Sequence, residues 1–279
     1  MSITRRSVIG RTILGALAAP AGEGAQEASQ TSSADEGQQF FLRLLKANDD
    51  AVGRMLNQPS GGRGGAARVG RGENIAALAA AYCSPESSYY RGDNLIALME
   101  RGAQALVDAQ NPDGLLDAGN LDSPPDTGFV VEATAASLEV ARRRQDARLT
   151  RVTDTLSKFL LKVGDGLVTG GIHTPNHRWV VCAALARINS LFPAAKYVNR
   201  IDDWLGEGIY QDADGQFPER SPNYARVEVN AFVTLARLLN RPALLDSSST
   251  LCEAKWRQLI DSIQGHAFQR EILVSRMIA

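Results

Sequence analysis

Two short segments about 50 residues apart carry side chains that can transfer protons. In the first, Asn176 and His177 follow the pair Thr174-Pro175. In the second, Tyr224 follows the pair Ser221-Pro222. A hydroxyl residue before proline is typical of a helix start, because proline lacks only an N–H that would have no partner there. When the two pairs are aligned, His177 matches Tyr224. The spacing therefore predicts an imidazole and a phenol, both acid–base groups, on the first turns of two helices.

The same segments supply candidate groups for binding an anion. The free N–H groups of a helix N-terminus carry partial positive charge, and arginines add full charges. We therefore expect a carboxylate or sulfate ligand flanked by proton-transfer groups. A first-turn histidine is also common as a cap or a surface residue, so a structural role for His177 stays open. The candidate ligand-binding residues are His173, Arg178, Arg220, Asn223 and Arg226.

An internal repeat relates the two segments. Asp-Gly pairs at 113–114, 165–166 and 214–215 recur about every 50 residues, and a Ser/Thr-Pro pair follows each of them. Aspartate and glycine favour turns, so each pair is expected to be a turn former. A repeat of this length with two helices per unit predicts stacked helical hairpins, forming an open solenoid or a complete or incomplete α/α toroid. Equivalent loops of such units lie on one face, which places the helix starts on a shared surface.

Helical periodicity dominates the chain, and no run of alternating strands is evident, so the expected fold class is all-α. The glycine-rich stretch 61–65 lacks the Gly-Lys-Ser/Thr ending of a phosphate-binding loop and is interpreted as a turn. The predicted helices cover 38–55, 73–82, 93–110, 126–144, 147–163, 175–191, 197–206, 222–240 and 251–263.

Composition excludes several classes of protein. The chain has 279 residues and a net charge of -1, which argues against a nucleic-acid-binding surface. Its three cysteines, Cys83, Cys182 and Cys252, cannot form a disulfide framework and lack metal-ligand spacing. We therefore expect neither a metal nor a cofactor. No apolar stretch is long enough for a membrane helix.

The N-terminus has the order of an export signal. Adjacent arginines in the stretch 4–9 precede apolar residues, and small residues follow at 19–21, as in a twin-arginine signal. A disordered tail that contains two arginines is the alternative. The expected organisation is a signal peptide at 1–25, a linker at 26–37, a helical domain at 38–265 and an irregular tail at 266–279. We expect a periplasmic or secreted protein.

The segment His-Thr-Pro-Asn-His-Arg-Trp (173–179), followed by Asp-Gly-Gln-Phe-Pro-Glu-Arg-Ser-Pro-Asn-Tyr (214–224), resembles the α/α-toroid domain of the heparinase II/III-like polysaccharide lyases. These include the alginate and oligoalginate lyases. The resemblance covers roughly residues 93–245. It implies that Asn176 and His177 neutralise a uronate carboxylate and that Tyr224 moves the proton. It also implies a β-sandwich domain after the toroid. The present sequence has none, so we expect the chain to correspond to the toroid part.

The resulting functional hypothesis is an exported lyase that cleaves a uronic-acid-containing polysaccharide by β-elimination. Its expected partner is an acidic polysaccharide or oligosaccharide. A toroid glycoside hydrolase acting on uronides is one alternative, with Asp126 as the best-placed acid. The pair Asp202-Asp203 is a weaker candidate, because neighbouring residues on a helix point apart. A non-catalytic carbohydrate-binding repeat protein is the other alternative.

Overall fold

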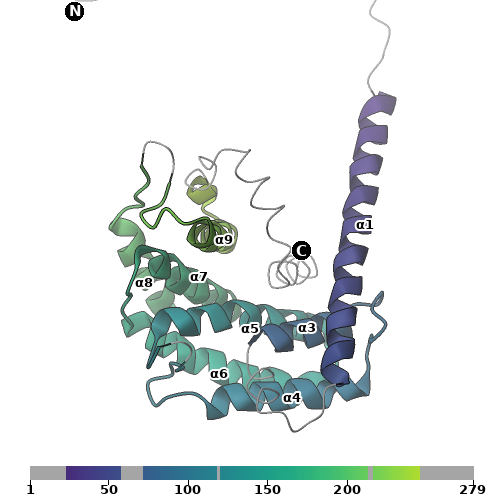
Figure 1. The fold of residues 1–279 in the computed structure, drawn as a ribbon, viewed down its shortest axis with the longest axis horizontal. Helices are drawn as coiled ribbons and strands as arrows, with labels where there is room; N and C mark the ends of the chain where they lie inside the picture. The colour runs from purple at the N-terminus through teal and green to yellow at the C-terminus, as the bar shows by residue number, and fades with distance from the viewer. Residues whose placement is uncertain (1–22, 58–71, 118–119, 213–215, 246–279) are drawn as a thin grey trace, which may run out of the picture. The chain divides into compact units, whose positions relative to one another are not determined.

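The computed structural model describes residues 23–57, 72–117, 120–212 and 216–245 (Figure 1). These residues are helical, with one isolated β-bridge and no strand among them, so the all-α prediction is confirmed. None of the helices within these ranges combines the length and apolar character that crossing a membrane requires. The helices are α1 (Glu23–Leu56), α3 (Gly72–Cys83), α4 (Asp93–Asp108), α5 (Pro124–Arg144), α6 (Thr150–Thr169), α7 (Pro175–Leu191), α8 (Ala195–Gly206) and α9 (Pro222–Leu238), with 3-10 turns η1 (Ala147–Leu149) and η2 (Pro242–Leu245).

The chain divides into two compact units, residues 1–41 and 42–279, and α1 contributes to both. Residues 26–37, which were expected to form a linker, are helical and belong to α1. Helix α1 has a polar N-terminal part, whose apolar residues are too sparse for the pattern used to predict helices. Most of the predicted signal peptide, the glycine-rich stretch, the helix at 251–263, the tail and Cys252 lie outside the described residues.

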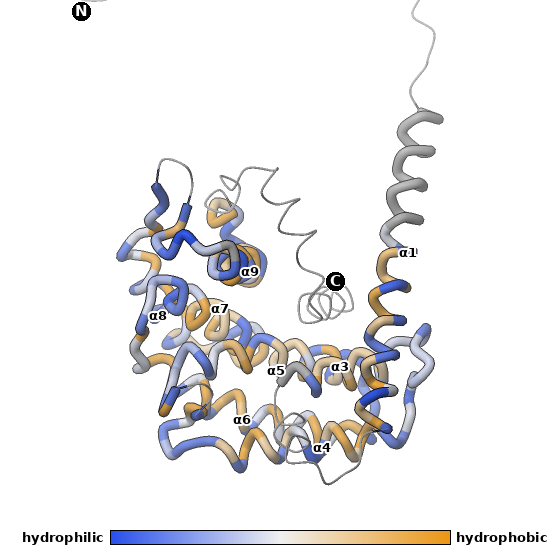
Figure 2. Tube along the Cα trace, viewed as in Figure 1, coloured by the Kyte–Doolittle hydropathy of each residue, from blue (hydrophilic) through white to orange (hydrophobic). Residues whose placement is uncertain are grey.

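Two rows of helices build the second unit (Figure 1). In one row α3, α5, α7 and α9 each pack against the next, and in the other α6 lies between α4 and α8. Successive helices also pair across the rows, as α3 with α4, α5 with α6 and α7 with α8. Figure 2 shows hydrophobic and hydrophilic residues alternating along these helices, as expected when one face of each is buried. Fully buried side chains on these helices include Met99, Leu138, Phe159, Tyr197 and Phe232.

The Asp-Gly pairs do not share one structure. Asp113-Gly114 forms the predicted turn, with Gly114 at φ +95° and the Asp113 carboxylate accepting the N–H of Leu115 at 2.9 Å. Asp165-Gly166 instead lies inside α6, which runs to Thr169 rather than ending at 163. Glycine at 166 serves close packing, because a Cβ there would approach the Asp113 carbonyl oxygen to 2.7 Å. The third pair, at 214–215, lies outside the described residues.

The Ser/Thr-Pro pairs mark helix starts as predicted, but only one hydroxyl group caps its helix. Helices α5, α7 and α9 begin directly after Ser123, Thr174 and Ser221. The Ser123 hydroxyl accepts the N–H of Asp126 at 3.3 Å. Thr174 and Ser221 make no such bond, so another group must satisfy the N-terminus of α7.

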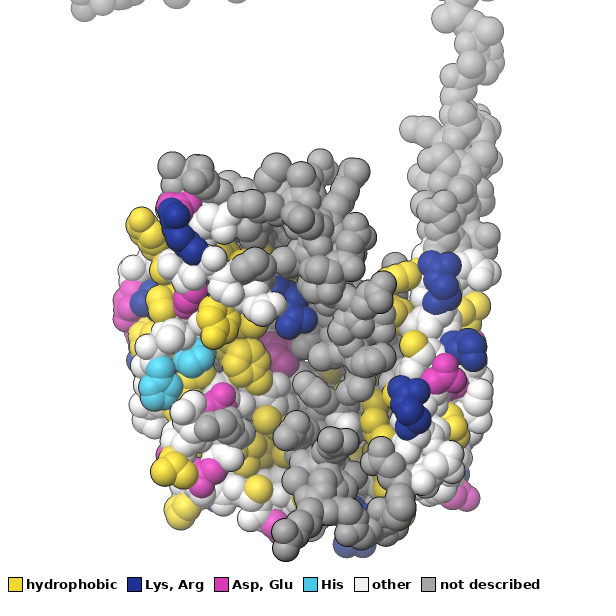
Figure 3. Space-filling model, viewed as in Figure 1, with side chains coloured by type: hydrophobic (Ala, Val, Ile, Leu, Met, Phe, Trp, Pro, Cys, Tyr) yellow, Lys and Arg dark blue, Asp and Glu magenta, His cyan; other side chains and the backbone are white. Residues whose placement is uncertain are grey.

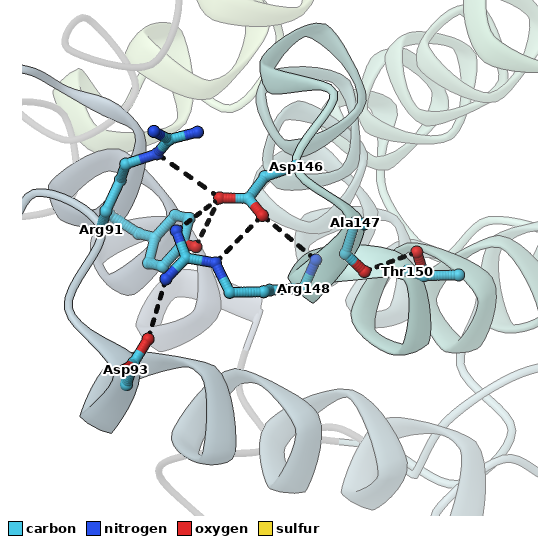
Figure 4. Close-up of polar contacts among 7 residues, drawn as sticks. Arg91, Asp93, Asp146, Ala147, Arg148 and Thr150 are labelled. Carbon is cyan, nitrogen blue, oxygen red and sulfur yellow. Dashed lines mark hydrogen bonds and ion pairs between the residues drawn. The ribbon is translucent and has the colours of Figure 1, made fainter.

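Asp146 joins three parts of the second unit (Figure 4). It lies between α5 and α6, and its carboxylate accepts the Tyr82 hydroxyl at 2.8 Å and the Arg148 side chain at 2.8 Å. The Arg91 guanidinium lies 3.5 Å away, and Arg148 also reaches Asp93 at the start of α4. Hydrogen bonds from Arg148 and Tyr82 hold the pKa of Asp146 well below its usual range. Desolvation by burial, followed by the Asp146 contact, raises the pKa of Tyr82 to about 12.

Candidate active site

The two segments identified from the sequence touch directly. The backbone N–H of Asn176 donates to Oε1 of Glu219 at 2.7 Å, and Nδ2 of Asn176 donates to the same oxygen at 2.9 Å. Glu219 therefore satisfies the α7 N-terminus in place of the Thr174 hydroxyl, and its negative charge complements the positive helix end. This contact ties the segment before α9 to the first turn of α7, on which His177 lies.

Asn176 acts mainly as a structural anchor in this arrangement. The residue is 2% exposed, and its Nδ2 also donates to the Thr174 hydroxyl at 3.0 Å. Both amide protons are thus used within the protein, while Oδ1 is buried without a partner. The sequence resemblance implies that this amide binds a substrate carboxylate, but in the structure its donors are engaged by Glu219 and Thr174.

His177 is half-buried, and its environment favours the neutral imidazole. Burial lowers the pKa of His177 below its ordinary value of 6.5, while the charges of Asp126 and Glu219 act in the opposite direction. Its ring meets the exposed His173 edge-to-face, with centroids 5.9 Å apart. Nδ1 of His177 is buried and has no hydrogen-bond partner. The electrostatic coupling to Asp126 brings the first turn of α5 to the same site.

Tyr224 and Asn223 are exposed on the first turn of α9, and Tyr224 keeps 49% of its surface accessible. Helix α9 packs directly against α7, so Tyr224 and His177 lie on the first turns of neighbouring helices. No hydrogen bond joins the two side chains. Figure 3 shows both described histidines at the surface beside a group of hydrophobic side chains. Phe129 of α5 and Tyr210, in the loop between α8 and α9, are further exposed aromatic residues.

The predicted arginines are only partly available to a ligand. Arg178 pairs with Glu207 at 2.9 Å, and its guanidinium lies 5.6 Å from the centre of the Trp204 ring. Arg220 pairs with Asp212. Arg226 is half-buried and makes no ion pair or hydrogen bond with the residues that the structure describes. The helix starts are therefore less positive than the sequence suggests, because carboxylates already neutralise much of their charge.

Two glutamates belong to the site although sequence reasoning gave neither a role. Glu219 caps α7, and Glu228 lies one turn after Tyr224 in α9 with no exposed surface. Burial, then the charge of Glu219, raises the pKa of Glu228 to about 9. A signal for Glu228 was present, because it falls between Ala225 and Phe232 on the apolar stripe of α9. Glu219 carried no comparable signal, since its partner lies 43 residues away.

Within the described ranges, no group of three or more histidine, cysteine, aspartate or glutamate side chains is arranged to hold a metal ion. Cys83 and Cys182 are free and buried, and burial raises the pKa of each thiol to about 12. Neither is a reactive thiolate at neutral pH. The described side chains at the site include imidazole, phenol and carboxyl groups, which can carry out acid–base chemistry.

Comparison with known proteins gave no assignment: no family model, curated protein or solved structure matches the chain.

Proposed function

We propose that the chain is the toroid part of an exported polysaccharide lyase that cleaves a uronic-acid-containing polymer by β-elimination. The observation that carries the proposal is the contact between Asn176 and Glu219. It joins the two segments that resemble the heparinase II/III-like lyases and brings their helix starts together. The exposed aromatic rings of Phe129 and Tyr224 offer surfaces against which sugar rings can pack.

The proposed reaction uses His177 and Tyr224 as an acid–base pair. The neutral imidazole of His177 takes the proton from C5 of the uronate, the C4–O bond breaks and a C4–C5 double bond forms. The Tyr224 phenol gives its proton to the departing oxygen. Afterwards the imidazole loses its proton to solvent and the phenolate takes one back from solvent, which restores both groups. His173 and Arg226, which are not committed to ion pairs, bind the carboxylate as negative charge develops on it. Asn176 holds the turn that carries His177.

We further propose that the helices form consecutive hairpin repeats of a toroid or incomplete toroid. The pairing of α3 with α4, α5 with α6 and α7 with α8 supports this arrangement, as does the packing of each odd-numbered helix on the next. Helices α5, α7 and α9 then occupy equivalent positions. Their first turns, which carry Asp126, His177 and Tyr224, form one edge.

The Tyr224→Phe variant is expected to lose roughly 100- to 10,000-fold in the rate of product formation, because phenylalanine has no proton to give. The measurement is ultraviolet absorbance of unsaturated uronate products over a panel of acidic polysaccharides. Tyr210→Phe is the matched control, since Tyr210 is 68% exposed in the loop before α9 and has no role in the reaction. Unchanged product release by Tyr224→Phe would remove Tyr224 from the mechanism.

The pH dependence of kcat/KM is expected to show an acid limb at a pH below 6.5, where His177 becomes protonated and can no longer accept the C5 proton. Burial places this limb lower than that of an exposed histidine. His177→Gln is expected to abolish activity, whereas His173→Gln keeps the acid limb and raises KM. An acid limb that persists unchanged in an active His177→Gln protein contradicts the assignment of the base.

A glycoside hydrolase is the second candidate, and the position of Asp126 favours it. Asp126 interacts electrostatically with His177, so an acidic group does lie at the proposed site. Hydrolysis of unsaturated uronides removes their ultraviolet absorbance, whereas elimination creates it. The same assay therefore separates the two reactions, and a carbohydrate-binding protein changes the absorbance in neither direction.

A further inference from the structure

A group of buried polar atoms without partners lies beneath the first turn of α7. Both carboxyl oxygens of Glu228 are buried and unpartnered, and so is Oε2 of Glu219. Burying a carboxylate without hydrogen bonds is expensive, so such an arrangement requires a compensating proton or partner. The group lies within the candidate site, but none of the roles assigned above explains it.

The two glutamates differ in their hydrogen-bond partners. Oε1 of Glu219 accepts two N–H donors from Asn176 at the N-terminus of α7. Glu228 receives none. Helix α9 packs against α7, whose ionisable groups are His177, Arg178, Cys182 and Arg187, and against η2, which has none. Of all these neighbours, Glu219 is the one whose charge acts on Glu228.

We infer that Glu228 is a neutral carboxylic acid that donates its proton to the free oxygen of Glu219, and that this pair fixes the turn carrying His177. A carboxylic acid has one O–H donor, and Oε2 of Glu219 is a buried acceptor in need of one. A single proton thereby satisfies both residues. The pair holds one negative charge, which the donors from Asn176 stabilise. Glu228 is a positioning residue and touches no substrate.

The sign of the pH effect follows from the higher affinity of the folded protein for this proton. An unfolded chain releases it near the ordinary glutamate value of 4.5, whereas the folded chain keeps it up to a pH of about 9. The stability that this proton contributes is complete below pH 4.5 and is lost as the pH rises toward about 9. At a higher pH the proton has left, and the pair of glutamates carries two negative charges.

The experiment compares Glu228→Gln, Glu228→Leu and the control Asp154→Asn, at an exposed position of α6, in thermal melts across this pH range. Glutamine keeps a donor without a charge, so its Tm advantage over the unmodified protein should grow with pH and level off near 9. Leucine offers no donor, so the Tm of Glu228→Leu should be lower than that of Glu228→Gln at every pH. The control should follow the unmodified protein. Parallel pH profiles for the unmodified protein and Glu228→Gln would overturn the inference, as would equal stability of the leucine and glutamine variants.

Two spectroscopic measurements complete the test if Glu228→Leu does not fold. The infrared carbonyl band of a protonated carboxylic acid should be present at neutral pH, disappear above pH 9 and be missing in Glu228→Gln. The imidazole proton resonance of His177 should shift over the same alkaline range in the unmodified protein and stay fixed in Glu228→Gln. Absence of the infrared change refutes the shared proton, and absence of the resonance shift refutes its effect on His177. Every measurement is made without substrate. A negative result for the shared proton therefore does not contradict the proposed lyase reaction, and a negative lyase assay does not contradict the shared proton.

Discussion

Asp146→Ala is expected to destabilise the protein more than any other loss of a charged side chain outside the candidate site. Its side chain is 7% exposed and binds groups from the end of α3, the segment before α4 and the short turn η1. Removing it leaves the fully buried Tyr82 hydroxyl without an acceptor, which costs about 1–3 kcal/mol. Arg91 and Arg148 also lose their shared anion. The free energy of unfolding, measured by urea titration, is the readout.

A matched control is available on the neighbouring helix. Asp154 lies exposed on α6 and has no hydrogen-bond or ion-pair partner within the described ranges. Asp154→Ala should therefore change the free energy of unfolding by less than about 0.5 kcal/mol. Equal effects of the two substitutions would show that the network in Figure 4 does not stabilise the fold.

The contribution of Asp146 should also depend on pH in a defined direction. Its pKa is lower in the folded than in the unfolded protein, so the folded state favours the ionised form. The stabilisation is complete above the unfolded value of about 3.9 and is lost as the pH falls toward the folded value. The difference between the unmodified protein and Asp146→Ala should therefore narrow in acid. A difference that stays constant down to the acid transition contradicts the ion-pair explanation.

Gly114→Ala is expected to cost about 2–5 kcal/mol of unfolding free energy for two independent reasons. Gly114 has φ +95°, a conformation that residues with a Cβ rarely adopt. A Cβ at this position would also lie 2.1 Å from the carbonyl oxygen of Lys162 in α6, a backbone atom that cannot move aside. The turn and α6 would have to separate, which breaks the hydrogen bond from the Lys162 amine to the Asn111 carbonyl.

Gly206→Ala separates this effect from a general consequence of replacing glycine. Gly206 ends α8, and a Cβ there would meet nothing within 4 Å. Alanine favours the helix by up to about 1 kcal/mol relative to glycine, so this variant should be slightly more stable than the unmodified protein. Similar losses for the two variants would contradict the close contact between the Gly114 turn and α6.

Local sequence signals predicted most helix positions. The range 175–191 agrees with α7 at both ends, and the Ser/Thr-Pro pairs place the starts of α5, α7 and α9 correctly or within two residues. These signals succeed because proline geometry and apolar periodicity act within one or two turns. They failed at Asp165-Gly166, where the same dipeptide that forms a turn at 113–114 continues a helix. Glycine is required at 166 because the Asp113 carbonyl oxygen, a neighbour only in the tertiary structure, leaves no room for a Cβ.

The sequence by itself determined the all-α class, the helix starts and the placement of Asn176 and His177 on the first turn of α7 and of Tyr224 on the first turn of α9. Only the tertiary structure decided which groups those residues meet. It turned the Asn176 amide toward Glu219, paired Arg178 and Arg220 with local acids, and buried Glu228 beside Glu219. The physical reason is the separation along the chain of the residues that interact. Helix propensity and capping depend on neighbours a few residues apart, whereas burial and charge pairing depend on segments that only packing brings together.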